Sequence, residues 1–243
     1  MLEQIDLKRV LPEPVYKKKI PDLRARLYAL QRQCWEKRLP VIMVFEGWGA
    51  SGRGAMVTFL TQNLEPRVFS LHMITAPRTN ETSMPWLWRF WVKFPNHGEV
   101  AIFDQSWYRR VLIDRVEKRV KRLEWQQAFE DINDLEHTLA DDGHLILKFF
   151  LHISKDTQQK RLKKQAKDPI SNALRDPEDR LQLKKHKAYF RAVEEMLMRT
   201  ETEWAPWTIV EAEDPRYARV KVFEAAIQRL QKGLEGKPDA GKP

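Results

Sequence analysis

An apolar run that passes directly into a glycine-rich turn constrains the fold of this chain more than any other feature. Residues 41–45 read Val-Ile-Met-Val-Phe, which is typical of a central parallel strand buried on both faces. Gly47 and Gly52 then stand at the two glycine positions of the phosphate-binding pattern G-x-x-x-x-G-K-[ST]. Residues 55–64 read as a helix whose N-terminus would face a bound phosphate. This order predicts a phosphate-binding loop more strongly than an ordinary strand–turn–helix connection.

The turn departs from the general pattern at its last two positions. Arg53 stands where the pattern has Lys, and Gly54 stands where it has Ser or Thr. The glycines still let backbone N–H groups approach an anion closely. The predicted phosphate-binding residues are Gly47, Gly49, Ala50, Ser51, Gly52, Arg53 and Gly54.

The composition is that of a globular protein without a membrane span. The 243 residues are 42% hydrophobic and 32% charged, and no apolar run reaches the length of about 18 residues that a span needs. The first residues lack the layout of a signal peptide. Cys34 is the only cysteine, which favours a reducing, cytoplasmic location, and its helical spacing from Leu27 and Leu30 predicts a core position.

The charge balance favours a polyanionic partner. The net charge is +9 and the pI is near 9.6, so the surface attracts nucleic acid, anionic membrane or polyphosphate. Few aromatic residues lie between the basic ones, so a stacking platform for single-stranded nucleic acid is not indicated. A merely solvated basic surface, or a nucleic-acid-binding protein, stays an alternative that rests on charge alone.

Predicted strands and helices alternate along the chain, which indicates a parallel five-stranded sheet covered by helices in a single domain over residues 1–234, followed by a disordered tail at 235–243. The expected strands are residues 41–45, 68–75, 99–103, 145–153 and 207–210, and the expected helices are residues 22–37, 55–64, 86–94, 106–120, 124–140, 156–166, 181–200 and 217–232.

Asp104 is the second chemical landmark. It ends the predicted strand 99–103, and the carboxyl end of a buried strand is where a phosphate-loop enzyme holds Mg²⁺. Arg109 and Arg110 follow within reach of phosphates. An alternative role for Asp104 is to cap the predicted helix that begins at Ser106.

Several segments, in order, resemble the family-2 polyphosphate kinases over roughly residues 10 to 232. They include Phe45-Glu46-Gly47-Trp48, Phe103-Asp104-Gln105-Ser106-Trp107-Tyr108 and Thr202-Glu203-Trp204-Ala205-Pro206-Trp207, together with Asn63–Arg67, Trp86–Trp91, Leu147–Lys155 and Tyr217–Lys221. The chain is most similar to the polyphosphate:AMP phosphotransferase branch, whose members often carry two such domains in tandem.

The resemblance implies a three-layer α/β P-loop kinase fold like that of thymidylate kinase, with a helical lid at about 155–180. It implies transfer of a phosphoryl group from polyphosphate to a nucleoside mono- or diphosphate with Mg²⁺, and a homo-oligomer or a pairing with an active homologue. The candidate catalytic residues are Asp104, which would also hold the metal, Arg53 and Arg109. The candidate nucleotide- or polyphosphate-binding residues are Arg78, Arg89, Arg110, Arg161, Lys164 and Arg175. The aromatic run 86–91 is interpreted as packing, with a nucleotide-stacking wall as the alternative.

The chain departs from the family pattern at sensitive positions. Where the family loop reads G-x-D-x-x-G-K-G, this chain has Gly49 for Asp and Arg53 for Lys, and Gln105 replaces the Arg that follows Asp104 in the family. The lid stretch after Pro169 differs as well. These departures favour weakened activity, or a non-catalytic homologue that binds polyphosphate or nucleotide or serves as an inactive partner subunit.

Overall fold

The computed structural model describes residues 2–169 and 177–235. Its centre is a sheet of five strands in the order β2-β3-β1-β4-β5, in which each neighbouring pair is parallel. The strands are β1 (Val41–Gly47), β2 (Phe69–Met73), β3 (Val100–Asp104), β4 (Leu145–His152) and β5 (Trp207–Glu211). The predicted sheet is confirmed, and each strand lies within two residues of its predicted bounds.

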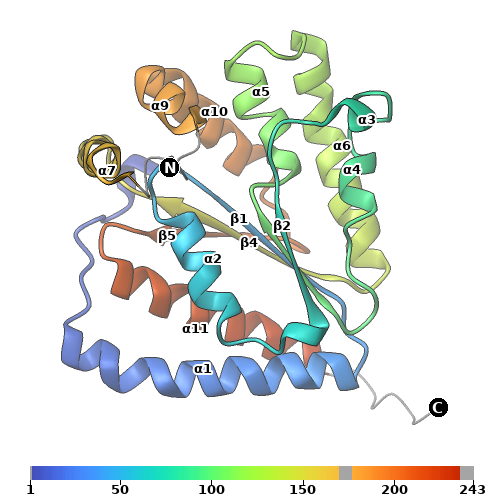
Figure 1. Ribbon diagram of the computed structural model, residues 1–243. Helices are drawn as coiled ribbons and strands as arrows, with labels where there is room; N and C mark the ends of the chain where they lie inside the picture. The colour runs from blue at the N-terminus through green and yellow to red at the C-terminus, as the bar shows by residue number, and fades with distance from the viewer. Residues whose placement is uncertain (1, 170–176, 236–243) are drawn as a thin grey trace.

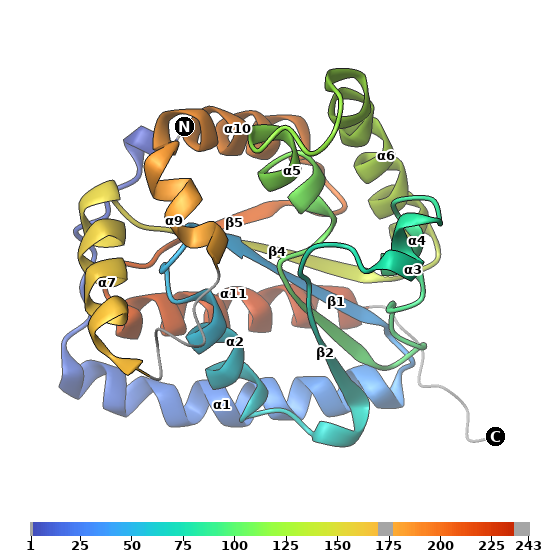
Figure 2. The same ribbon diagram turned by 45° about the horizontal axis from the view of Figure 1, so that its top comes forward.

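Helices cover both faces of the sheet, which gives the three-layer arrangement that the alternating pattern predicts (Figure 1). One face carries α1 (Glu13–Glu36), α2 (Arg53–Thr61) and α11 (Pro215–Leu234). The other carries α5 (Ile113–Val116), α6 (Arg122–Asp141) and α10 (His186–Arg199). Figure 2 shows α7 (Lys155–Lys167), at the left edge of the view, beside α9 (Pro177–Lys184), and the two helices are in contact. The described residues also contain the short elements η1 (Leu2–Gln4), η2 (Pro66–Val68), α3 (Thr79–Thr82), α4 (Trp88–Trp91) and η3 (Trp107–Arg110).

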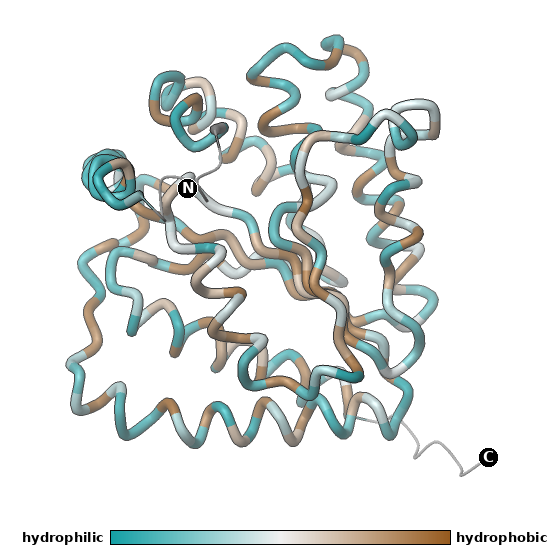
Figure 3. The backbone as a smooth tube through the Cα atoms, in the orientation of Figure 1, coloured by the Kyte–Doolittle hydropathy of each residue, from teal (hydrophilic) through white to brown (hydrophobic). Residues whose placement is uncertain are grey.

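The core lies between the sheet and its two helical layers. The side chains of β1 from Val41 to Phe45 are all buried, as expected of a central strand with covered faces. Hydrophobic colour gathers along the strands in Figure 3, whereas α7 is mostly hydrophilic. Cys34 is fully buried on α1, which confirms its predicted core position. Within the described residues, no helix combines the length and the apolarity needed to cross a membrane.

Several helix predictions were wrong in their extent. α1 begins at Glu13 rather than residue 22 and continues through Pro21, because its long packing contact with α11 compensates for the missing N–H of the proline. The predicted helix 106–120 is instead η3 and α5, separated at Leu112, whose φ and ψ of −105° and −88° are not helical. The predicted helix 181–200 is divided at Lys185 into α9 and α10.

Two further segments also differ from prediction. The predicted helix 86–94 contracts to the single turn α4, and Pro95 disfavours a helical conformation at the residue before it. The predicted lid at 155–180 contains α7 and the beginning of α9, and its residues 170–176 lie outside the described residues. The predicted tail lies outside them from residue 236 onward.

Candidate functional site

Three strand ends meet at the edge of the sheet where the site is built. β3, β1 and β4 are neighbours that run in one direction, so their carboxyl ends lie together. Phe45 of β1 stands opposite Asp104 of β3, and the glycine turn follows two residues later. In an open parallel sheet, ligands bind in the crevice at this edge, where connections diverge from a central strand. The sheet therefore brings the glycine loop (residues 47–54) beside Asp104.

The two ends of the glycine loop are defined by the backbone conformation of Gly52 and by the contacts of Trp48. At its exit, Gly52 has a φ of 92°, a left-handed conformation that suits glycine, and Arg53 follows as the first residue of α2. At its entry, the buried indole of Trp48 donates from Nε1 to Nδ1 of His152 at 2.8 Å and stacks on the ring of His186. Burial lowers the pKa of His152, which keeps Nδ1 available as an acceptor.

Arg161 of α7 holds the middle of the loop through backbone carbonyls. Its Nη1 donates to the carbonyls of Ala50 (3.2 Å) and Ser51 (3.0 Å). Its Nη2 donates to the carbonyls of Ala212 (2.8 Å) and Glu213 (2.9 Å), which follow β5. The structure thus gives Arg161 a role in shaping the loop, and its predicted contact with polyphosphate stays a prediction.

Arg53 and Asp104 form the central charge pair of the site. The Nε of Arg53 donates to Oδ1 of Asp104, and both side chains are largely buried, with exposed fractions of 14% and 11%. Beneath them lies Glu46, whose carboxylate accepts a 2.8 Å hydrogen bond from the hydroxyl of Ser106. Burial raises the pKa of Glu46 to about 7, against the opposing effect of Arg53. The hydroxyl of Ser106 also accepts from the N–H of Tyr108, so Ser106 caps η3 and the alternative capping role for Asp104 is wrong.

Gln105 lies beside this pair. With its amide oxygen turned toward Arg53, that oxygen accepts from Nη2 at 3.1 Å, while the amide nitrogen donates to the carbonyl of Ile74 at 3.0 Å. Gln105 thus supports the orientation of the Arg53 guanidinium and links it to the segment after β2. An arginine at this position would bring a second cation against Arg53.

Gly49 is covered by α9. Its N–H donates to Oε1 of Gln182 at 2.7 Å, within a buried contact. A Cβ added at Gly49 would lie 2.6 Å from Oδ1 and 2.8 Å from Cα of Asp179. The carboxylate of Asp179 therefore stands against the loop position where the family pattern has its own aspartate.

Arg109, on η3 after β3, is joined to α9 through the carboxylate of Glu178. Its two terminal nitrogens donate to the two carboxylate oxygens of Glu178 at 2.6 and 2.5 Å. Arg119 donates to Glu178 as well, at 2.6 Å. Asp114 lies 3.5 Å from Nε of Arg109. Burial raises the pKa of Asp114 despite these arginines, whereas the hydrogen bonds from both arginines outweigh burial and lower the pKa of Glu178.

These groups line a cavity of about 950 Å³, a size that accommodates a nucleotide or a short phosphate chain. The wall combines the glycine loop, the end of β3 and α9. The residues that line the cavity include Gly49, Arg53, Asp104, Arg109, Arg119, Glu178 and Asp179.

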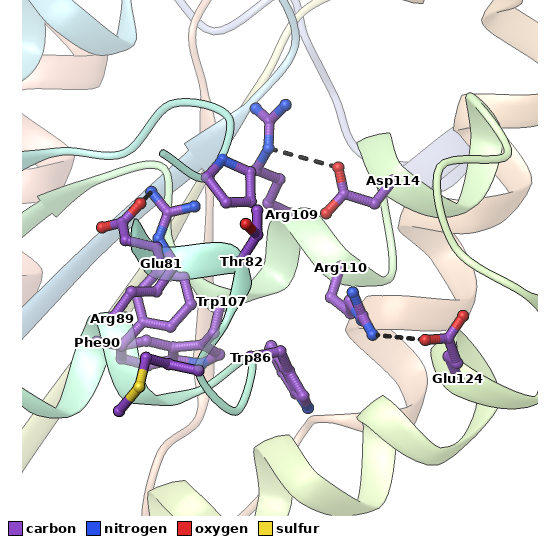
Figure 4. A pocket seen from close by; sticks show the side chains of 12 residues that line it. Glu81, Thr82, Trp86, Arg89, Phe90, Trp107, Arg109, Arg110, Asp114 and Glu124 are labelled. Atoms are coloured by element: carbon purple, nitrogen blue, oxygen red, sulfur yellow. Dashed lines mark hydrogen bonds and ion pairs between the residues drawn. The ribbon is translucent and has the colours of Figure 1, made fainter. Parts of the chain in front are cut away.

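A second cavity of about 350 Å³ lies beside the first and shares Arg109 with it. Figure 4 shows Trp86 and Arg110 on one side and Arg89 on the other. Arg110 lies over the Trp86 ring at 5.5 Å and pairs with Glu124 at 3.3 Å, and Arg89 pairs with Glu81 at 3.4 Å. Aromatic and cationic groups of this kind suit a nucleoside and its phosphate.

The aromatic run 86–91 divides between the two roles considered from sequence. Phe90 is buried and packs edge-on against Trp107, at 5.9 Å between ring centroids, which agrees with the packing interpretation. Trp86 instead lines the second cavity, and Trp91 is half exposed.

The remaining predicted binding residues lie apart from these cavities or outside the described residues. Arg78 and Lys164 are exposed, and neither lines either cavity. Arg175 falls within residues 170–176, outside the described residues. Their predicted roles stay predictions.

Sequence reasoning missed Arg119, Glu178, Asp179 and Gln182. Glu178 and Asp179 stand in a stretch rich in lysine and arginine and near other acidic residues, so the local pattern did not single them out, although cationic partners were available to them. The sequence did not reveal which arginines those partners are.

The carboxylates near Arg53 bear on metal binding. Among the described residues, no group of three or more His, Cys, Asp or Glu side chains is arranged to hold a metal ion. Yet Asp104, Glu46 and Asp179 each act to raise the pKa of Arg53, and carboxylate oxygens are ligands that Mg²⁺ prefers. Their chemistry fits the cation, with Arg53 holding Asp104 by its Nε.

Comparison with known proteins identifies the family. The model for Polyphosphate kinase 2 (PPK2) matches residues 11–237. This chain belongs to the polyphosphate kinase 2 family. It is 40% identical over 231 residues to a polyphosphate:AMP phosphotransferase of Pseudomonas aeruginosa, covering 95% of this chain and 47% of that protein. It is 31% identical to an ADP-polyphosphate phosphotransferase of Rhizobium meliloti, covering 93% of this chain and 81% of that protein.

Solved structures agree with the family assignment and with the P-loop kinase fold. A putative polyphosphate kinase 2 from Pseudomonas aeruginosa superposes with a TM-score of 0.92 at 37% identity, covering 98% of this chain and 51% of that one. A polyphosphate kinase 2 from Arthrobacter aurescens gives 0.91 at 28% identity, covering 100% and 89%. The chain spans about half the length of the Pseudomonas relatives it matches.

Proposed function

We propose that this chain transfers a phosphoryl group from inorganic polyphosphate to a nucleoside mono- or diphosphate at the cavity between the glycine loop and α9. The observation that carries the proposal is the meeting of Arg53, from the loop, with Asp104, from the adjacent strand end, inside that cavity. The family and its named relatives supply the class of reaction. We also propose that residues 1–234 form one domain.

Phosphoryl transfer requires mainly positioning and charge stabilisation. In the proposed reaction Arg53 and the N–H groups at the start of α2 bind the donor phosphates, and Arg109 stabilises the phosphoryl group as it passes from the donor to the acceptor. The acceptor nucleoside occupies the smaller cavity against Trp86 and Arg110. Asp104, with Glu46 and Asp179 nearby, would hold Mg²⁺, which neutralises charge on phosphate oxygens when bound.

Two features favour a second candidate, a non-catalytic homologue or partner subunit. Arg53 stands at the family's lysine position, and its guanidinium neutralises the carboxylate predicted to hold metal. Such a chain would bind polyphosphate or nucleotide without turning it over, or would act only when paired with an active homologue.

One assay separates the two candidates. Purified chain is incubated with polyphosphate, Mg²⁺ and a panel of AMP, GMP, ADP and GDP, and products are resolved by ion-exchange chromatography, with EDTA as the metal-free control. Metal-dependent formation of a nucleotide with one more phosphate supports the enzyme. Binding of polyphosphate in a salt-dependent manner with no product, at enzyme concentrations equal to substrate, supports the second candidate.

A further inference from the structure

Glu178 is held by two arginines as a bound anion would be. Arg109 grips both of its carboxylate oxygens, and Arg119 adds a third contact to one of them, all at 2.5 to 2.6 Å. The planar guanidinium presents paired N–H donors that match a carboxylate and a phosphate equally well. The geometry is therefore that of an oxyanion site with a carboxylate in place.

The two sides of this contact belong to different parts of the fold. Arg109 lies on η3, directly after β3, and its side chain is only 4% exposed. Glu178 lies on α9, which follows residues 170–176, outside the described range. The arginine is thus a fixed part of the framework, whereas the carboxylate is delivered by a separate helix.

The position of the pair fits a substrate group. Arg109 lines both cavities, and Arg119 and Glu178 line the larger one. Ion pairs join both Arg109 and Arg119 to the carboxylates of Asp114 and Glu178. A phosphoryl group that replaces the Glu178 carboxylate keeps the two arginines paired with an anion, so the exchange leaves no buried cation uncompensated.

We propose that Arg109 and Arg119 form a binding site for a phosphoryl group, and that Glu178 is its internal occupant, which the substrate displaces. The ligand class is the phosphoryl group of a phosphoanhydride or phosphate ester: a terminal group of polyphosphate or the phosphate of the acceptor nucleotide. The inference rests on the proposed function and adds to it Arg119 as a binding residue and Glu178 as a competitor.

Competition between Glu178 and a phosphoryl group for the two arginines predicts the direction in which each substitution changes ligand affinity. Replacing Glu178 by the neutral isostere Gln removes the competing charge but keeps the side-chain volume. Glu178→Gln therefore increases affinity for the ligand that uses the site, by about tenfold, within the range of close charge pairs. Arg119→Gln decreases it by about the same factor. In the double variant, the gain from Glu178→Gln shrinks, because the two residues act on one another.

Isothermal titration calorimetry with tripolyphosphate and, separately, with AMP tests this and distinguishes the two sources of the phosphoryl group. Glu195→Gln is the matched control for the acid, since Glu195 pairs with Arg115 at 2.7 Å elsewhere on the surface. Lys118→Gln is the matched control for the cation, since Lys118 is exposed and adjacent to Arg119. Circular dichroism and thermal melts confirm that each variant is folded.

Tighter binding of tripolyphosphate by Glu178→Gln assigns the site to the donor, and tighter binding of AMP assigns it to the acceptor. Unchanged or weaker binding of both ligands by a folded Glu178→Gln, in a chain whose wild type turns over polyphosphate, overturns this inference and leaves the proposed function standing. If Glu178→Gln does not fold, an Arg119→Gln variant that binds as Lys118→Gln does overturns it. A wild type that neither binds nor turns over either ligand overturns both.

Discussion

The two walls of the larger cavity are held in place by different kinds of interaction. The framework wall, with Arg53 and Asp104, is fixed by the parallel register of β1 and β3 and by the covalent continuity of strand, loop and α2. The opposite wall, α9, meets the framework through polar side chains, chiefly Glu178 and Gln182. A substrate anion can compete with side-chain contacts of the second kind, whereas it cannot displace the strand register and chain continuity of the first. The framework therefore sets where the reaction happens, and α9 sets how readily the site fills.

The same comparison changes the meaning of a sequence departure. The family pattern has a carboxylate at position 49, and this chain has glycine there. Asp179 approaches from α9 to within the space that a Cβ at Gly49 would fill. The loop has lost a carboxylate, but the opposite wall supplies one beside the vacated position. Gly49 is thus matched to α9, and restoring aspartate there would displace the helix rather than repair the loop.

The largest expected effect comes from removing the framework carboxylate. Asp104→Asn removes the partner of Arg53 and the proposed oxygen ligand of Mg²⁺, so kcat falls by about 10²–10³-fold, the range for losing one preorganised charge. Turnover of AMP and ADP with polyphosphate measures this. Asp22→Asn on α1, an exposed residue far from the cavity, is the control. Unchanged turnover in folded Asp104→Asn would remove Asp104 from the site.

Arg53→Lys changes the same wall of the cavity, but we expect it to raise kcat and not to lower it. A compact ammonium releases the Asp104 carboxylate from the guanidinium while it keeps the positive charge at the start of α2. We expect kcat to rise about tenfold, equivalent to roughly 1.4 kcal/mol of barrier. Steady-state kinetics of the two proteins side by side measure the change. If the wild type is already as fast, Arg53 serves in place of lysine.

Gly49→Ala tests the contact between the walls. Its Cβ would meet the backbone of Asp179 at 2.8 Å, so α9 must shift, and we expect hydrogen exchange of the α9 amides to quicken about tenfold. Gly54→Ala is the contrast, since its Cβ comes no nearer than 3.7 Å to another side chain and alanine favours α2 by about 1 kcal/mol. Equal exchange rates for α9 in the two variants would show that Gly49 does not govern its docking.

The smallest effect concerns the loop entry and is pH-dependent. Burial lowers the folded-state pKa of His152 below its usual value near 6.5. The contribution of neutral His152 to folding stability is therefore complete above about pH 6.5 and is lost as pH falls toward and through the folded-state pKa. Protonation at Nδ1 also removes the acceptor for Trp48. Between pH 7.5 and pH 5.5 the thermal midpoint of the wild type should fall by about 2–4 °C more than that of His152→Asn. This difference corresponds to about 1 kcal/mol of folding stability.

His137→Asn on α6 supplies the matched control for that titration, because His137 is half exposed and pairs with Asp141 instead. Wild type and His152→Asn losing the same stability on acidification would show that His152 does not titrate with folding.

The framework could be predicted from sequence, but the side-chain contacts by which α9 docks on it could not, for a physical reason. An apolar run such as Val41–Phe45 encodes a buried strand locally, and a glycine turn after it fixes where the loop and Asp104 lie. The pairing of Glu178 with Arg109 and Arg119 joins residues about 60 to 70 positions apart through side chains alone, which no local pattern records. The break between η3 and α5 was missed likewise, because buried Trp107 and Tyr108 both donate to Glu136, a tertiary contact.

Arg161 has a consequence for motion. Its guanidinium joins α7 to the loop and to the end of β5 through four carbonyls at once. For α7 to swing outward, four backbone acceptors would have to exchange this one donor group for water together, a concerted loss that thermal fluctuation makes rare. α7 is therefore tied through a single side chain to both the glycine loop and the end of β5.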